Sequence, residues 1–208
     1  MEAPLPVSYE LIKTRIATLP KTSGEFDVLL DAVKAEMQAI LFLRVPSDRA
    51  TYYEHKGILK PSAREGFPTA YIELQKAGNA YALGLYTASV FHCSRAAEIG
   101  VRALATKLGV KFPYPLELAD SQNMLDQIAS KIKAMGPKPK SKKKDADLKF
   151  YSEAGAQFGY FKDAWRVRVS HARENYEQDH ALRILNHTCE FFEGLSERLS
   201  EPKERSTS

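Results

Sequence analysis

The sequence predicts an all-α protein, built as an antiparallel helical bundle with an N-terminal helical hairpin. Apolar residues recur at three- and four-residue steps through most of the 208 residues, which is the period of helices with one buried face. No hairpin dipeptide lies between alternating apolar runs, so signals for β-strands are nearly absent. Prolines and glycines divide the chain into helical stretches with connections between them, as in helical bundles.

The N-terminal helical hairpin is expected over residues 1–65. Ser8 is a suitable N-cap for a helix that runs to Leu19 and stops at Pro20. A second helix is expected over residues 25–43; Pro46 ends it, and a loop or short-helix connection follows. The apolar stripe of this second helix consists of Phe26, Leu29, Leu30, Val33, Met37, Ile40 and Leu41.

The segment 66–200 predicts the main bundle, which begins with a helix from Pro68 to about Leu83. The next helix, over residues 85–108, is rich in small side chains. Because small side chains let helices approach closely, we expect this helix at the centre of the bundle. Its small residues are Ala88, Ser89, Cys93, Ala96, Ala97, Gly100 and Ala103.

Three more helices are expected, over residues 121–133, 147–169 and 177–199. The second of them carries an aromatic stripe whose spacing favours one buried helix face over a base-stacking surface. Residues 201–208 are polar and are expected to form a disordered tail. The stripe consists of Phe150, Tyr151, Ala154, Phe158, Phe161 and Trp165.

The composition is that of a globular protein, with 44% hydrophobic and 27% charged residues. No apolar run is long enough to span a bilayer and the first residues lack a secretion signal, so we expect a cytoplasmic protein without membrane contact. Cys93 and Cys189 lie in predicted helices, as expected of buried thiols in a reducing compartment. No Cys/His ligand cluster is present, and we expect neither a metal nor a cofactor.

The net charge of +4 comes from one segment. Residues 131–149 hold eight lysines against two aspartates, a local charge of +6, which leaves about −2 for the rest of the chain. This segment would attract RNA electrostatically, or it is simply a solvated connection, and both interpretations stay open. The lysines that we assign to nucleic-acid binding are Lys138, Lys140, Lys142, Lys143 and Lys144.

Arg166 and His171 are the main candidates for chemistry. They stand five positions apart, a little over one helical turn, so both side chains can point into one cleft. Phosphodiester cleavage needs a cation to hold charge developing on phosphorus and a group that moves a proton near neutral pH. The alternative is structural, with both side chains binding groups at a helix C-terminus.

A second polar group lies on the central helix. His92, Arg95, Glu98 and Arg102 follow one another at steps of three, three and four, which places them on one helix face. Because buried charges are costly unless paired, such a line is either a salt-bridged surface stripe or the wall of a functional cleft.

Three stretches of the chain resemble a bacterial group of HEPN-type proteins (higher eukaryotes and prokaryotes nucleotide-binding). The first is Phe67-Pro68-Thr69-Ala70, and the second runs from Val90 to Glu98. The third runs from Phe150 through Arg166 to Arg173 and continues into the closing helix. The resemblance covers about residues 25–200 and is strongest over 67–110 and 150–195.

This resemblance implies a bundle of four to five core helices that often forms a homodimer. Two copies of the motif then meet across the interface as a metal-independent endoribonuclease site. Arg166 would hold the scissile phosphate, and His171 would act as general base or acid on a ribose 2′-hydroxyl. The products would be a 2′,3′-cyclic phosphate and a 5′-hydroxyl. His92, Arg95 and Glu98 would support this pair, and a neutralising protein partner would accompany such a nuclease.

Val167 departs from the family pattern, in which the residue after the motif arginine is often small and polar, commonly Asn, in active members. Valine offers no hydrogen bond to a substrate or an imidazole. Two functions therefore stay open. One is an endoribonuclease; the other is a catalytically inactive module that binds RNA, a nucleotide or a protein through the same cleft.

Overall fold

All regular structure is helical in the part of the chain that the computed structural model describes, namely residues 6–16, 20–38, 40, 43–112, 121–137, 141–165 and 175–202. This part holds eight α-helices, one 3-10 helix and no strand, which confirms the all-α prediction. The elements are α1 (Pro6–Ile16), α2 (Ser23–Gln38), η1 (Ala50–Tyr52), α3 (Pro61–Gly66), α4 (Pro68–Ala82), α5 (Tyr86–Lys107), α6 (Ser121–Met135), α7 (Lys142–Trp165) and α8 (Gln178–Ser196).

The chain divides into two compact units, residues 1–44 and 45–208, whereas we predicted the boundary at residue 65. Residues after 44 group with the bundle because η1 packs on α4, and α3 packs on both α4 and α8. Gly78 of α4 allows the first of these contacts, since a Cβ there would lie 2.9 Å from the backbone oxygen of Tyr52. The bundle therefore includes the connection that we had assigned to the hairpin.

Within the first unit, α1 and α2 pair as a hairpin. Glu36 of α2 accepts hydrogen bonds from the backbone N–H groups of Val7 and Ser8, each at 2.8 Å, and from the Ser8 hydroxyl. The first N–H groups of a helix lack partners in the helix, so a carboxylate is favourable there. The hydrogen bonds from Ser8 lower the pKa of Glu36. We predicted Ser8 as the N-cap, but it lies inside α1 and Glu36 binds the first turn instead.

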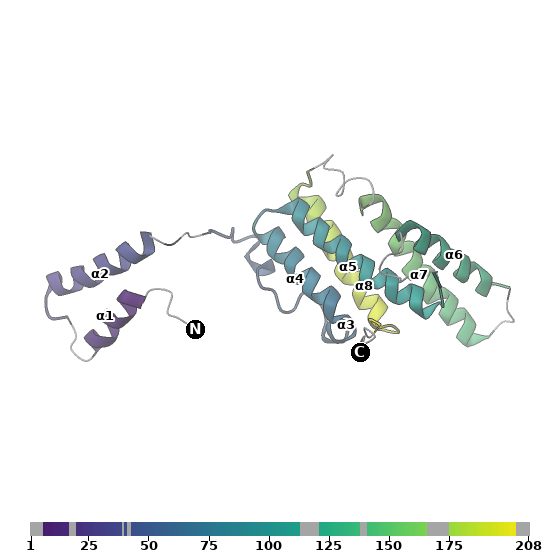
Figure 1. Cartoon of the computed structure of the whole chain (residues 1–208), viewed down its shortest axis with the longest axis horizontal. Helices are drawn as coiled ribbons and strands as arrows, with labels where there is room; N and C mark the ends of the chain where they lie inside the picture. The colour runs from purple at the N-terminus through teal and green to yellow at the C-terminus, as the bar shows by residue number, and fades with distance from the viewer. Residues whose placement is uncertain are drawn as a thin grey trace. The chain divides into compact units, whose positions relative to one another are not determined.

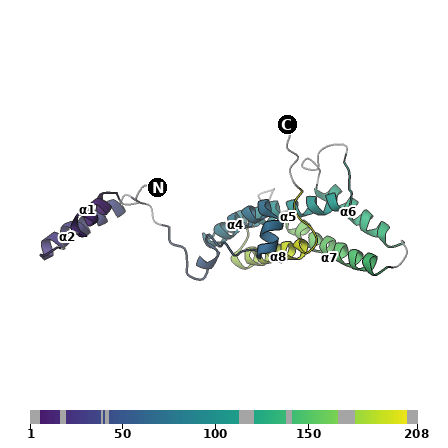
Figure 2. The same cartoon turned by 90° about the horizontal axis from the view of Figure 1, so that it is seen from below.

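Helix α5 lies at the centre of the second unit and packs on α4, α6, α7 and α8. Figure 1 shows α4 on one side of the α5–α8 pair, and α6 with α7 on the other. The view from below, in Figure 2, agrees. Gly84, at a φ of 78°, lies in the turn between α4 and α5, and this left-handed conformation favours glycine.

The small-residue face of α5 is buried inside the bundle. Cys93, Ala96, Ala97 and Gly100 are all buried. A Cβ on Gly100 would lie 2.7 Å from Cε1 of Phe191, so α8 approaches α5 more closely than a larger residue permits. This face is occupied within the chain and is not left for a second copy.

Aromatic rings from α7 and α8 fill the core beside α5. Phe158 and Phe191 meet edge to face with ring centroids 4.5 Å apart, a favourable geometry for aromatic pairs. Tyr151 and Phe158 of the predicted stripe are buried, which confirms that this part of the stripe is core. The side chains of Phe161 and Trp165 lie outside the described residues.

The C-terminal end of the described chain binds the start of α4. The Glu201 carboxylate accepts hydrogen bonds from the backbone N–H groups of Thr69 and Ala70, at 3.1 and 2.9 Å, and the Glu201 N–H donates to the Gly66 carbonyl at 2.8 Å. We predicted a disordered tail from residue 201 onward. Glu201 instead caps α4, and residues 203–208 lie outside the described part of the chain.

The length and hydropathy of the helices and the state of the two cysteines bear on the remaining predictions. None of the helices in the described ranges is long and apolar enough to cross a membrane. Cys93 in α5 and Cys189 in α8 are free thiols. We predicted both as buried; Cys93 is fully buried, whereas Cys189 is partly buried against the core. Burial raises the pKa of both thiols, that of Cys189 to about 12.

Candidate anion-binding site on helices α4 and α5

The structure brings two of the predicted site residues together around a carboxylate that we had not singled out. Glu73 of α4 is only 6% exposed. Its Oε2 atom accepts a hydrogen bond from Nδ1 of His92 at 2.8 Å and one from Nε of Arg95 at 3.1 Å. Its Oε1 atom accepts a hydrogen bond from Nζ of Lys76 at 3.0 Å. We call these four side chains the Glu73 cluster.

The helical periods explain this geometry. Lys76 follows Glu73 by three residues on α4, and Arg95 follows His92 by three on α5, so each pair shares a helix face. The two faces meet because α4 and α5 are joined by a short turn and pack along their length. One carboxylate can then reach cations from both helices.

Glu73 is ionised at neutral pH. Burial raises the pKa of its carboxyl, but hydrogen bonds from His92 and Lys76 and the charge of Arg95 outweigh that effect and hold the pKa below its ordinary value. Because a carboxylate only accepts hydrogen bonds, Nδ1 of His92 carries the proton in this contact. The other ring nitrogen, Nε2, is the one that remains for a ligand.

The cationic ends of the cluster reach solvent. The side chains of Lys76 and Arg95 are 52% and 56% exposed, against 26% for His92. Two permanent cations face one carboxylate, so the cluster is net positive even with a neutral imidazole. Arg95 binds Glu73 through Nε, which leaves its terminal nitrogens for a ligand. This arrangement suits an anion.

Phe91 adds an exposed aromatic ring beside these cations. Its ring centroid lies 5.8 Å from that of His92 in an edge-to-face arrangement, and the Arg95 guanidinium lies 5.9 Å from it. The Phe91 side chain is 47% exposed. An exposed ring next to cations can stack a nucleobase while the cations bind phosphate.

Glu98, the third supporting residue that we predicted, does not join the cluster. It pairs with Arg102 one helical turn further along α5, at 3.1 Å. The predicted polar line is therefore two separate groups: one organised by Glu73, and one ordinary pair within the helix.

The predicted catalytic pair lies outside the described residues. Arg166, Val167 and His171 fall between the end of α7 at Trp165 and the described chain that resumes at Asn175. The pairing of Arg166 with His171 stays a prediction.

The chain that follows this pair is attached to the start of α5. The Tyr176 N–H donates to Oγ1 of Thr87 at 3.2 Å, and the Tyr86 hydroxyl donates to Oε1 of Gln178 at 3.0 Å. The Arg49 guanidinium in turn donates to the Tyr86 hydroxyl. The entry to α8 is thus fixed to the same helix that carries His92 and Arg95.

The lysine run lies on the other side of the bundle from α4. Lys142, Lys143 and Lys144 form the first turn of α7 rather than a loop, and Figure 1 shows α7 across the α5–α8 pair from α4. Nζ of Lys144 donates to the Gly136 carbonyl at 2.6 Å. Lys138 and Lys140 lie outside the described residues.

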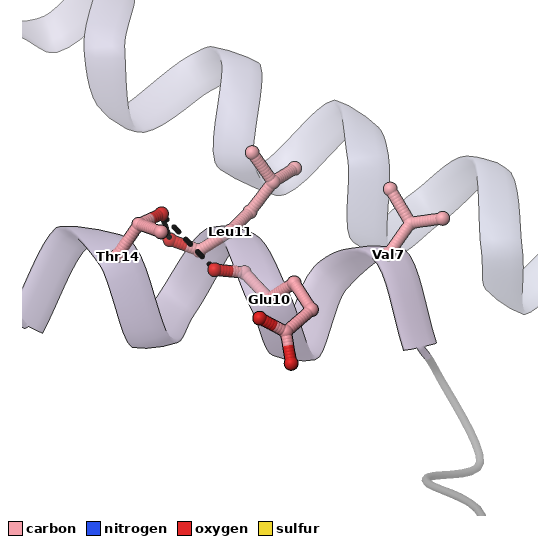
Figure 3. Close-up of a pocket in the computed structure, with 4 residues that line it drawn as sticks. All are labelled: Val7, Glu10, Leu11 and Thr14. Carbon is pink, nitrogen blue, oxygen red and sulfur yellow. Dashed lines mark hydrogen bonds between the residues drawn. The ribbon is translucent and has the colours of Figure 1, made fainter.

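A surface hollow lies in the first unit, on α1 (Figure 3). It encloses about 470 Å³ and is lined by Val7, Glu10, Leu11 and Thr14. The Thr14 hydroxyl is bonded to its own helix backbone, and Figure 3 shows Val7 and Leu11 pointing toward the neighbouring helix. The hollow's other polar lining residue, Glu10, pairs with Lys13 at 3.7 Å. Both polar residues are thus bonded within their own helix, so the Glu73 cluster is the better candidate for chemistry.

Three residues of the candidate site were missed from the sequence: Glu73, Lys76 and Phe91. A signal for Glu73 was present, because it follows Ala70 by three residues and precedes Ala77 by four on the apolar face of α4. A charged residue in such a position needs partners. Over the residues that the structure describes, no group of three or more His, Cys, Asp or Glu side chains could hold a metal ion.

Comparison with known proteins gives no match, whether with protein-family models, with curated proteins or with solved structures. We therefore infer function from the geometry of the Glu73 cluster and from the residue pattern of the sequence.

Proposed function

We propose that this protein binds RNA through the surface formed by α4 and α5. The Glu73 cluster carries the proposal, because a buried carboxylate holds an imidazole, a guanidinium and an ammonium together where they meet solvent. Cations fixed in this way bind the phosphates of a nucleic acid with little loss of side-chain entropy.

Each side chain has a distinct role in this proposal. Arg95 and Lys76 bind phosphate oxygens through charge-assisted hydrogen bonds. The Nε2 atom of His92 bonds a ribose 2′-hydroxyl, the group that distinguishes RNA from DNA. Phe91 stacks on an unpaired base. Glu73 does not touch the RNA, and it acts as a positioning residue for Lys76, His92 and Arg95.

We further propose that Arg166 and His171 cleave the bound RNA without a metal, the reaction that the HEPN resemblance implies. His171 removes the proton from a 2′-hydroxyl, whose oxygen forms a new bond to phosphorus. The bond from phosphorus to the 5′-oxygen breaks, and that oxygen takes a proton from a general acid, giving a 2′,3′-cyclic phosphate and a 5′-hydroxyl. Arg166 neutralises the charge that develops on phosphorus.

Two observations favour a site that joins the pair to the cluster. The segment with Arg166 and His171 leads directly to Tyr176, and Tyr176 is bonded to Thr87 at the start of α5. His92 lies a little over one turn further along the same helix. Val167 favours the alternative, in which the same surface binds RNA without cleaving it.

Binding is tested by fluorescence anisotropy with a labelled single-stranded RNA over a range of salt concentrations. Arg95→Ala and Lys76→Ala should each weaken binding by about tenfold and lower the salt slope by about one. Lys107→Ala is the matched control, since it removes an exposed cation from the last turn of the same helix. Equal losses for Arg95→Ala and Lys107→Ala would contradict a site at the Glu73 cluster.

Cleavage is tested on the same RNA in the presence of EDTA. The wild-type protein should produce a 2′,3′-cyclic phosphate, and Arg166→Ala or His171→Ala should abolish this product. Arg168→Ala serves as the control, because it removes a cation that lies between the two motif residues but has no assigned role in cleavage. Cleavage that survives both motif substitutions rules the assigned pair out. Binding without any cleavage identifies the inactive module.

A further inference from the structure

Helix α2 carries an apolar stripe that its own hairpin leaves exposed. Among its large apolar side chains, Phe26 is 52%, Leu30 37% and Met37 42% exposed. Ile40, just past the end of the helix, is 38% exposed. The fifth member of the stripe, Val33, is half-buried. Exposed apolar residues that gather in a line mark an interaction surface, whereas scattered ones do not.

The spacing of the stripe is that of a coiled coil. Its members follow one another at steps of four, three, four and three residues, a seven-residue repeat. The side of α2 with half-buried Leu29, Ala32 and Glu36 is centred elsewhere on the helix, and Glu36 binds the first turn of α1. Val33 lies between the two sides and is half-buried as well. The stripe is therefore a second face, with the period that a further helix would match.

The hairpin has too little core to stand on its own. α1 has 11 residues and α2 has 16, and α2 buries none of them. Over the described residues of this unit, Ser8 is the single buried side chain. Isolated helices of this length are marginal in water, and units of this size usually need oligomerisation or another constraint to fold.

We propose that a second copy of this chain covers the stripe, with the two α2 helices paired antiparallel. When the two stripes are aligned antiparallel, Phe26 packs against the partner's Met37, and Leu30 packs against the partner's Val33. Each of these apolar layers occurs twice because a twofold axis relates the copies. The stripe is thus complementary to itself.

The charges beside the stripe select this orientation. In the antiparallel pair, Asp27 lies next to the partner's Lys34, and Lys34 next to the partner's Asp27, which gives two opposite-charge pairs. A parallel pair would place Lys34 beside the partner's Leu29 and would satisfy neither charge. Both side chains are exposed in the hairpin. Lys34 pairs there with Asp31 at 3.3 Å, and Asp27 accepts a hydrogen bond from Ser23 at 3.5 Å. Exposed contacts of this kind contribute little free energy, so pairs across the interface can replace them.

This interface is independent of the proposed RNA-binding surface, because the Glu73 cluster belongs to the second unit. It also differs from an interface formed by the small-residue face of α5, which is buried within the chain. Loss of RNA binding and loss of the dimer are thus separate results.

The proposal is tested on the full chain by multi-angle light scattering after size-exclusion chromatography. The wild type should have the mass of two chains, and Leu30→Glu with Met37→Glu the mass of one. Val28→Glu is the matched control: Val28 is 61% exposed on α2 but lies off the stripe, so this variant should stay dimeric. Far-UV circular dichroism reports whether each variant keeps its helical structure.

A charge reversal tests the orientation without adding charge to the stripe. Asp27→Lys and Lys34→Asp should each raise the dimer dissociation constant by about tenfold, because each creates two like-charge contacts. The two reversals together should restore wild-type dimerisation, since the opposite charges again face each other. A double variant as weak as the single ones would overturn the antiparallel arrangement.

Two results would overturn the interface itself. A wild-type chain with the mass of a monomer would mean that something other than a second copy covers the stripe. A dimer that survives Leu30→Glu with Met37→Glu would place the contact between copies elsewhere in the chain.

Discussion

At Glu73, one nearly buried carboxylate binds cationic side chains from two helices. Its two oxygens accept hydrogen bonds from His92, Arg95 and Lys76 at 2.8, 3.1 and 3.0 Å. Carboxylates that lose water need such partners, and these partners in turn lose freedom of movement. The residue that holds the cluster together is thus the one least accessible to a ligand.

Glu73→Gln should lower the free energy of unfolding at neutral pH by roughly 1–2 kcal/mol, because a charged acceptor shared by three donors becomes a neutral amide. The folded-state pKa of Glu73 is lowered, so its stabilisation is present above the unfolded value of 4.5 and is lost as the pH falls through the folded value. Urea unfolding of wild type and variant measures this. Their difference should shrink as the pH drops below 4.5; a constant difference contradicts the assignment.

The sequence revealed part of this site. His92 and Arg95 could be singled out because they form a polar line on a helix of small residues. Glu73 and Lys76 could not be joined to them, since their contact depends on how α4 packs on α5. Glu98 was grouped with them by helical period alone, and the period does not distinguish a partner on the next helix from Arg102 on the same one.

The two thiols should be inert in the native protein. Burial raises the pKa of Cys189 to about 12 and that of Cys93 further, and only the thiolate reacts with aromatic disulfide reagents. Titration with such a reagent at mildly alkaline pH should label neither thiol in the folded chain and both in urea. Rapid labelling without denaturant would show that α5 and α8 do not enclose them.

At the level of helices, periodicity predicted the long elements of the second unit well, because α4, α5 and α8 each bury one face. The expected helices at 85–108 and 121–133 correspond to α5 and α6 within a few residues. Helix α7 was expected from residue 147 but starts at Lys142. Three lysines in a first turn oppose the helix dipole, and the hydrogen bond from the Lys144 N–H to the Ser141 hydroxyl helps to offset this.

Gly100→Ala should lower the free energy of unfolding by about 1–3 kcal/mol, because the new methyl group would meet the Phe191 ring, which packs on Phe158 and cannot move freely. Gly194→Ala on α8 is the control. A Cβ there meets nothing within 4 Å, so helix propensity should make this variant about 0.5–1 kcal/mol more stable. Chemical denaturation measures both, and a stabilised Gly100→Ala would contradict the close approach of α5 and α8.

Across the whole molecule, two groups of basic side chains are candidates for binding a nucleic acid. The lysine-rich segment 131–149 dominates the net charge, and its described lysines at the start of α7 lie across the bundle from α4. The Glu73 cluster holds fewer charges, but its cations are fixed by a buried partner. The charge counted along the sequence pointed to the lysine-rich segment as the RNA-binding surface. The fixed geometry of the Glu73 cluster makes that cluster the better candidate for specific RNA recognition.

The boundary between the two units could not be predicted from the sequence. The connection after Pro46 has no apolar period that assigns it to either unit, and only its packing on α4 and α8 places it with the bundle. The two proposed surfaces should therefore respond separately to substitution. Changes in the α2 stripe should affect the association of copies, and changes in the Glu73 cluster should affect RNA binding.

Amide hydrogen exchange with and without a single-stranded RNA tests the central claim most directly, because it reports where along the full chain the ligand binds. Protection should be gained around Glu73 and Lys76 in α4 and over residues 91–95 in α5, and Arg95→Ala should reduce it. Protection confined to the lysine-rich segment 131–149, with α4 and α5 unchanged, would contradict the account.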